Sequence, residues 1–209
     1  MEDIRCEYKR RKDKIRKRIR EFEALGKSSD EDIFSELCFC ILTPQSNALN
    51  CHRAVGELKK SGLLLGGSAR EIGRKLIGVR FHNNKARYLV EARRLFKNCN
   101  GIDIKNRIRG KNVSIIREWL VKNVKGLGYK EASHFLRNIG YGKDLAILDR
   151  HILKNMKRCG VIKEIPKTLN RNKYMALENK IRRFSKKIKI SMGDIDLLFW
   201  ARETGVIFK

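Results

Sequence analysis

Hydrophobic residues recur every three or four positions along most of the chain, which is the spacing of one face of an α-helix. The most apolar stretch, from Ile33 to Leu42, follows Ser28 and Ser29, and serines in that place are typical of a helix start. Strict alternation of polar and apolar residues, which is typical of β-strands, is nearly absent. The pattern therefore predicts an all-α fold of about ten helices, with Ile33–Leu42 as a central buried helix.

Other segments repeat the helical spacing between glycines and a few polar turns. Helices are expected at about 4–25, 46–61, 68–77, 82–97, 112–123, 150–156 and 195–201. Only Pro44 and Pro166 interrupt the chain, and proline is the residue that a helix interior tolerates least. Ser191 and Asp194 have the spacing of a helix cap before the last of these segments.

The charge of the chain indicates a class of binding partner. The 209 residues include 49 Lys and Arg against 23 Asp and Glu, a formal net charge of +26. Nucleic acid is the first partner that such an excess favours, although a solvated surface, as in a ribosomal or heat-adapted protein, would look the same. The sequence has no apolar run long enough for a membrane span and does not begin like a signal peptide, so we expect a cytoplasmic protein without a membrane partner.

The six cysteines, at positions 6, 38, 40, 51, 99 and 159, are scattered. Zinc and iron–sulfur sites gather several thiolates through short loops such as C-x-x-C. No C-x-x-C occurs here, and the only close pair, Cys38 and Cys40, is spaced C-x-C. We therefore expect free thiols, no metal site and no cofactor.

The segment 121–136 has the pattern of two helices joined by a tight turn. Lys125 precedes Gly126-Leu127-Gly128, and glycines allow a turn to approach a ligand closely. Amides at the start of the second helix could hold a phosphate, so Lys125, Gly126 and Gly128 are candidate DNA-binding residues. An ordinary helix–helix turn is the alternative, because G-x-G alone is weak evidence.

Lys130 follows this turn, and Asp149 lies 19 positions beyond it, after the glycine-rich connection 140–142. This order resembles the helix-hairpin-helix DNA glycosylase superfamily that also contains endonuclease III. Further segments, including residues 37–43, 128–138, 147–152 and 164–169, are similar to archaeal-type 8-oxoguanine DNA glycosylase/lyases. The resemblance begins near residue 30, and the first 28 residues are more basic than that family leads us to expect.

The resemblance implies two helical lobes flanking a DNA-binding cleft. One lobe would comprise residues 27–142, with the hairpin at about 112–139, and the other residues 1–26 with 143–209. It also implies a monomeric enzyme of base excision repair that acts on double-stranded DNA containing 8-oxoguanine.

Within that resemblance, Lys130 is the expected nucleophile. A lysine amine attacks only when it has lost its proton, and burial or a neighbouring cation favours that loss. Asp149 has two possible roles, which can hold together. Its carboxylate could stabilise positive charge on the sugar in the transition state, and its side chain could cap the helix that begins at Arg150. Without the motif, a solvated surface lysine would be the default for Lys130.

The resemblance also implies the residues that read the base. Phe81 and Trp200 would hold the extruded base between them, although both could instead be core aromatics. The carboxylate of Lys209 would accept the N7 hydrogen that distinguishes 8-oxoguanine from guanine. Gln45 occupies the place of a residue that fills the gap left by the base, and a turn role for it is equally possible.

Two other functions fit parts of the sequence. An endonuclease III-like enzyme for oxidised pyrimidines shares the lysine and the aspartate, but it expects four clustered cysteines after the hairpin, where only Cys159 lies. A non-catalytic helix-hairpin-helix module would hold DNA through Gly126 and Gly128 and would need neither Lys130 nor Asp149.

Overall fold

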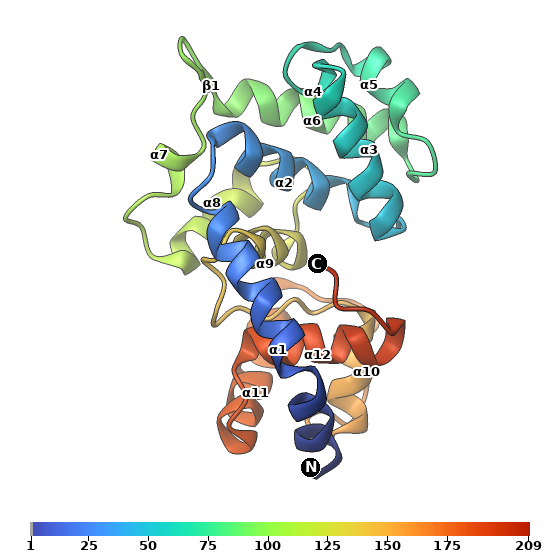
Figure 1. The fold of residues 1–209 in the computed structure, drawn as a ribbon, viewed down its shortest axis with the longest axis vertical. Coiled ribbons are helices and arrows are strands. Elements are labelled where there is room, and N and C mark those ends of the chain that lie inside the picture. The colour runs from blue at the N-terminus through green and yellow to red at the C-terminus, as the bar shows by residue number, and fades with distance from the viewer. Residues whose placement is uncertain (1) are drawn as a thin grey trace. The chain divides into compact units, whose positions relative to one another are not determined.

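The computed structural model describes residues 2–209, apart from the side chain of Glu2. Twelve α-helices and one two-stranded ribbon occur in this range, so the predicted all-α fold class is confirmed (Figure 1). The expected number of helices, about ten, was low. Two of the twelve, α4 (Leu63–Gly66) and α7 (Lys105–Ile108), are single turns, which are too short for a hydrophobic period to reveal.

The chain divides into two compact units. We call Lys27–Phe135 the mid-chain unit, and Met1–Gly26 with Leu136–Lys209 the terminal unit. The chain passes from the mid-chain unit back to the terminal unit inside helix α9 (Tyr129–Asn138). We expected this boundary after residue 142. It falls inside α9 because Arg137 packs on the Phe22 ring, 4.7 Å from its centroid, and pairs with Asp196 at 3.3 Å.

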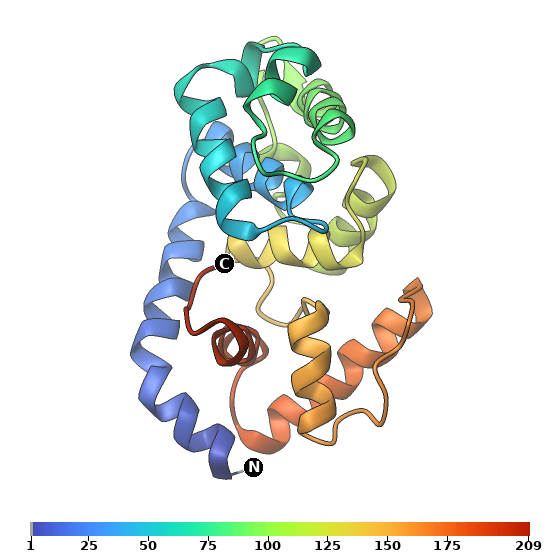
Figure 2. The same ribbon diagram turned by 90° about the vertical axis from the view of Figure 1, so that its right-hand side faces the viewer.

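Helix α2 (Asp30–Leu42) forms the core of the mid-chain unit, as the sequence predicted. Between Ile33 and Leu42 every residue except Ser35 is buried. Helices α3 (Ala48–Lys60) and α6 (His82–Phe96) pack against α2, and α5 (Ala69–Lys75) packs against α3 and α6 (Figure 2). The apolar run is thus buried on nearly all sides, which explains why it shows no polar face.

The rest of this unit is a connection that leads to the hairpin. Strands β1 (Lys97–Asn98) and β2 (Gly101–Ile102) pair antiparallel, with Lys97 opposite Ile102. The sequence did not predict this ribbon, because strands of two residues have no measurable alternation. Helix α8 (Val113–Asn123) follows α7 and ends where the hairpin turn begins.

Helix α12 (Met192–Thr204) is the centre of the terminal unit. It contacts α1 (Glu2–Leu25), α10 (Arg150–Arg158) and α11 (Arg171–Ile188), and Figure 2 shows it end-on between them. The helix begins three residues earlier than expected, directly after Ser191, whose side chain accepts a hydrogen bond from the Asp194 amide. All residues from Met192 to Phe199 are buried.

Helix α11 is the one long helix absent from our prediction. Met175 and Ala176 are not buried, but five of its apolar residues have helical spacing and are buried: Tyr174, Leu177, Ile181, Phe184 and Ile188. Basic residues fill the remaining face of the helix and weaken its contrast with the polar segments around it. The spacing of apolar residues was therefore sufficient to predict this helix, although the many basic residues made it hard to recognise.

Helix α1, the basic segment that the resemblance did not explain, is a structural part of the terminal unit. The Tyr8 hydroxyl donates a hydrogen bond to Asp194 at the start of α12. Arg202, near the end of α12, pairs with Asp3 at 2.9 Å and with Glu7 at 2.8 Å. None of the helices in the described range is long and apolar enough to cross a membrane.

Candidate functional site

The hairpin between α8 and α9 has the geometry that its glycines predicted. Gly126 has φ +88°, a left-handed conformation that favours glycine, and the Leu127 amide donates to the Val124 carbonyl at 3.2 Å. Leu127 is buried beneath the turn. Ala132, a small residue of α9, is completely buried.

A tyrosine of α6 supports this turn. A Cβ atom on Gly126 would lie 2.7 Å from Cδ2 of Tyr88, so the turn and the ring leave no room for a side chain. Lys125 lies 5.8 Å from the centroid of the same ring and 3.8 Å from Glu91, with its side chain 63% exposed. The turn is thereby fixed to α6, and the ammonium of Lys125 remains accessible to a phosphate.

The start of α9 differs from our expectation in one respect. The Gly128 amide, which we expected to point outward and be free for a phosphate, donates to Oε2 of Glu131 at 3.2 Å. Glutamate at the third helical position often reaches back to the first free amide in this way. The spacing of Gly128 and Glu131 was the signal for this cap, and our interpretation of the hairpin missed it.

Lys130 lies between the turn and Glu131. Its side chain is 25% exposed, and Nζ is 3.6 Å from Oε1 of Glu131. Lys85 of α6 is close enough to interact with it electrostatically: burial lowers the pKa of Lys85, and the positive charges of Arg80 and Lys130 lower it further. Lys130 is therefore a partly buried amine with a carboxylate and a second amine nearby, unlike a solvated surface lysine.

Gln45, Phe81 and Gly126 come together around one pocket of the mid-chain unit, with a volume of about 220 Å³. Gln45 and Phe81 are two of the few non-glycine residues with positive φ in the described range, at +55° and +58°. Phe81 is 54% exposed, so it is not a core aromatic. Strained backbone of this kind is concentrated at binding sites, and the observation fits the predicted roles of both residues.

Asp149 begins α10 as its N-cap. One carboxylate oxygen accepts a hydrogen bond from the Ile152 amide at 2.8 Å, so the capping role that we considered is present. The carboxylate is half-buried. Its second carboxylate oxygen remains available for a further contact. The two proposed roles of Asp149, capping and charge stabilisation, are therefore compatible.

Two residues of α11 hold the irregular segment that leads to Asp149. The Tyr174 hydroxyl donates to the Ala146 carbonyl at 2.6 Å, and the Leu148 amide lies 3.3 Å from the same hydroxyl. Glu178 accepts from the Ala146 amide at 2.9 Å. Both side chains are buried. Sequence reasoning missed them because it did not identify α11.

Trp200 lies on α12 and meets His151 of α10 edge to face, with ring centroids 5.0 Å apart. The side chain is only half-buried, yet Nε1 itself is buried and has no hydrogen-bond partner among the described residues. A buried indole N–H normally finds a partner, so this donor is unusual for a structural tryptophan. Lys209 ends the segment that follows α12 and is also half-buried.

Glu203 joins the helices that carry Asp149 and Trp200. Its carboxylate lies 2.6 Å from Lys154 and 3.2 Å from Nδ2 of Asn155, and it also pairs with Arg158. A hydrogen bond from Lys154 lowers the pKa of Glu203, and the charge of Arg158 acts in the same direction. The C-terminal part of α12 is thereby held along α10, through the His151–Trp200 contact and through Glu203.

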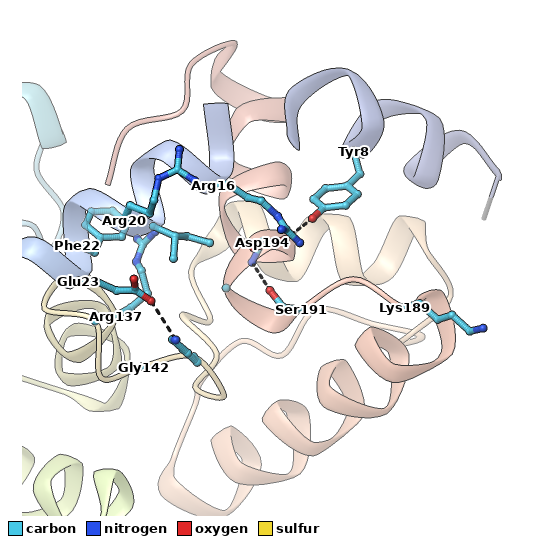
Figure 3. A pocket seen from close by; sticks show the side chains of 14 residues that line it. Tyr8, Arg16, Arg20, Phe22, Glu23, Arg137, Gly142, Lys189, Ser191 and Asp194 are labelled. Atoms are coloured by element: carbon cyan, nitrogen blue, oxygen red, sulfur yellow. Dashed lines mark hydrogen bonds and ion pairs between the residues drawn. The ribbon is translucent and has the colours of Figure 1, made fainter. Parts of the chain in front are cut away.

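A larger pocket of the terminal unit, of about 370 Å³, contains none of the predicted site residues (Figure 3). Helix α1, residues 137–143 and the start of α12 line much of it. Figure 3 shows the hydrogen bond between Tyr8 and Asp194. Glu23 pairs with Lys143, 3.0 Å away. The carboxylates that line this pocket are thus engaged in holding α1 to its neighbours.

The six cysteines form no disulfide, and the described residues hold no group of three or more His, Cys, Asp or Glu side chains arranged for a metal. Lys130 belongs to the mid-chain unit and Asp149 to the terminal unit. The predicted site residues are therefore divided between the two units.

Known proteins match the whole chain. A protein from Fusobacterium nucleatum, named 8-oxoguanine DNA glycosylase/AP lyase, is 47% identical over 97% of this chain and 94% of its own length. A protein of the same name from Methanocaldococcus jannaschii is 44% identical over 95% of this chain and 93% of its own.

Solved structures agree. The M. jannaschii 8-oxoguanine glycosylase/lyase, crystallised with a 15mer DNA containing 8-oxoguanine, matches with a TM-score of 0.89 and 41% identity over 100% of both chains. The 8-oxoguanine DNA glycosylase of Thermotoga maritima matches with a TM-score of 0.88 and 37% identity over 100% of this chain and 97% of its own. The family model described as 8-oxoguanine DNA glycosylase matches residues 15–190. The chain belongs to the 8-oxoguanine DNA glycosylase family.

Proposed function

We propose that this protein removes 8-oxoguanine from double-stranded DNA and then cleaves the DNA strand at the resulting abasic site. The observation that carries the proposal is the match, over the full length of both chains, to a glycosylase/lyase bound to DNA containing 8-oxoguanine. The net charge of +26 supports a polyanionic substrate. The bacterial and archaeal relatives support a cytoplasmic location, where the enzyme would meet nucleoid DNA.

Lys130 is the proposed nucleophile for both reactions. Its deprotonated amine attacks C1′ of the damaged nucleotide, and the bond to the base breaks, with the electron pair leaving on the base, which takes up a proton. Opening of the sugar ring then gives a Schiff base between C1′ and the lysine nitrogen. The Schiff base acidifies the C2′ proton, and loss of that proton expels the 3′ phosphate. The partial burial of Lys130 supports this role.

Asp149 is proposed to stabilise the positive charge that develops on the sugar as the base leaves. Electrostatic stabilisation by a fixed group is often the largest contribution to catalysis. The hydrogen bond to the Ile152 amide and the support from Tyr174 and Glu178 would keep the carboxylate fixed.

Base reading is proposed for Phe81, Trp200 and Lys209. Phe81 and Trp200 would stack on the extruded base, and the exposed ring of Phe81 supports a ligand there. The segment that ends at Lys209 would supply the acceptor for the N7 hydrogen of 8-oxoguanine. Gln45 would fill the gap in the duplex.

The hairpin is proposed to hold the DNA backbone through Lys125, Gly126 and Gly128. For the Gly128 amide to bind a phosphate, the carboxylate of Glu131 must first move away from it. A phosphate oxygen would then replace one anionic acceptor by another, with little change in the hydrogen bonding of the amide.

The test is an excision assay on three duplexes that differ at one position: 8-oxoguanine, guanine and thymine glycol. We expect release of 8-oxoguanine and a strand break at that position, with the other two duplexes intact. Excision of thymine glycol alone would instead indicate an endonuclease III-like activity. Binding of all three duplexes without cleavage would indicate a non-catalytic DNA-binding module, and either result would refute the proposal.

A further inference from the structure

A buried lysine outside the predicted site joins the two segments that carry Gln45 and Phe81. Lys85, in the first turn of α6, is only 4% exposed. It lies on the face of α6 that also buries Leu89, Ala92 and Phe96, where an apolar residue is usual. A lysine in such a place is costly unless its ammonium is fully hydrogen-bonded, so its contacts need an explanation.

All three protons of the Lys85 ammonium have an acceptor. Nζ donates to the carbonyls of Leu42 and Pro44, each at 2.7 Å, and to the hydroxyl oxygen of Ser46 at 2.9 Å. Leu42 is the last residue of α2, where carbonyls lack helical partners and a positive charge is favourable. The lysine therefore holds the segment 42–46, in which Gln45 has its strained conformation.

Ser46 extends the connection to Phe81. Its hydroxyl oxygen also accepts a hydrogen bond from the Arg80 amide at 3.0 Å. Gln45 precedes Ser46 directly, and Phe81 follows Arg80 directly, so each strained residue is adjacent in the chain to one end of this hydrogen bond. Both line the pocket of about 220 Å³ beside Gly126 of the hairpin.

We infer that Lys85 is a positioning residue that fixes Gln45 and Phe81 in their binding geometry before DNA arrives. A left-handed conformation at a non-glycine residue costs about 1–3 kcal/mol and persists only where surrounding contacts enforce it. Lys85 and Ser46 provide such contacts for both segments at once. A site organised in advance avoids the cost of ordering its residues on binding. This inference rests on the proposed function of the protein.

The inference predicts different effects of a Lys85 substitution on base excision and on strand nicking. Excision requires that the base be extruded and held, whereas nicking of a preformed abasic site has no base to hold. We expect Lys85→Met to slow single-turnover excision of 8-oxoguanine by about 10- to 100-fold, as misplacement of a binding group by about 1 Å does. Nicking of the abasic duplex also uses the Lys130 amine, which lies near Lys85, but there is no base to hold, so nicking should fall by a clearly smaller factor than excision.

Two further variants complete the experiment, one as a second test and one as a control. Ser46→Ala removes one acceptor of Lys85 and the acceptor of the Arg80 amide while leaving the ammonium in place, so it should show the same selective loss to a smaller extent. It carries the test if thermal unfolding shows that Lys85→Met does not fold. Lys75→Met removes an exposed lysine of the same unit and should match wild type in both reactions.

Wild-type enzyme is assayed first. If it excises 8-oxoguanine and both reactions then fall equally in the folded variants, or neither falls, the positioning role is wrong although the proposed function stands. If wild type excises nothing, the proposed function fails, and the inference that depends on it fails too. A selective loss of excision in Ser46→Ala and in folded Lys85→Met supports the role.

Discussion

Asp149 combines a structural contact with a proposed catalytic one, and a single substitution separates them. Asparagine keeps a side-chain oxygen that can accept from the Ile152 amide, so Asp149→Asn should leave the start of α10 intact. It removes the negative charge, however. We expect the turnover number to fall by about 100- to 1,000-fold with DNA affinity unchanged. Single-turnover kinetics measure the turnover, and a binding titration measures the DNA affinity. Full activity of the variant would mean that Asp149 acts only as a helix cap.

The residues with a proposed chemical role were more predictable than those proposed to support them. Lys130 and Asp149 were identifiable because their interval after a glycine turn is a feature of the sequence itself. Lys85 and Tyr174 act through contacts with residues 39 and 28 positions away, respectively, and no local pattern encodes such contacts. A lysine at a buried position of an otherwise apolar helix face was the one available hint for Lys85.

Helix positions followed from hydrophobic spacing wherever a helix has one buried and one exposed face. Helix α2, which is apolar on nearly all sides, was found by its composition, and α11 was missed because its many basic residues obscured a regular apolar stripe. The division inside α9 was not predictable, since it depends on how Arg137 packs against Phe22. Local signals therefore specified the helices, and long-range packing determined their grouping.

The hairpin turn depends on glycine for two separate reasons. Gly126→Ala would place a methyl group in the left-handed region and 2.7 Å from the Tyr88 ring, so we expect a loss of about 1–2 kcal/mol in unfolding free energy and weaker DNA binding. Chemical denaturation with a DNA titration measures the two effects.

Gly56→Ala is the matched control, because that glycine lies in α3 with open space around it. The control should stabilise the protein by about 0.5–1 kcal/mol. In a double-mutant cycle, Tyr88→Ala should relieve the steric part of the Gly126→Ala effect, and purely additive energies would contradict the contact.

The net charge of +26 concerns the molecule as a whole and its affinity for DNA. If phosphate contacts dominate binding, the logarithm of the affinity should fall linearly with the logarithm of the salt concentration. Lys125→Ala should reduce that slope by about one unit, because it removes one phosphate contact, whereas Lys125→Arg should preserve it. Binding titrations at several salt concentrations test this, and an unchanged slope in Lys125→Ala would exclude the contact.

The claim that joins all these observations is that the Lys130 amine forms a covalent bond with the sugar of the damaged nucleotide. Sodium borohydride reduces a Schiff base to a stable amine, so it should trap wild-type protein on a duplex that contains 8-oxoguanine. Lys130→Gln, which keeps a side chain of similar length without an amine, should give no adduct and still bind the duplex. Peptide mapping should place the adduct on Lys130. An adduct of equal yield in Lys130→Gln, or none with active wild type, would contradict the account.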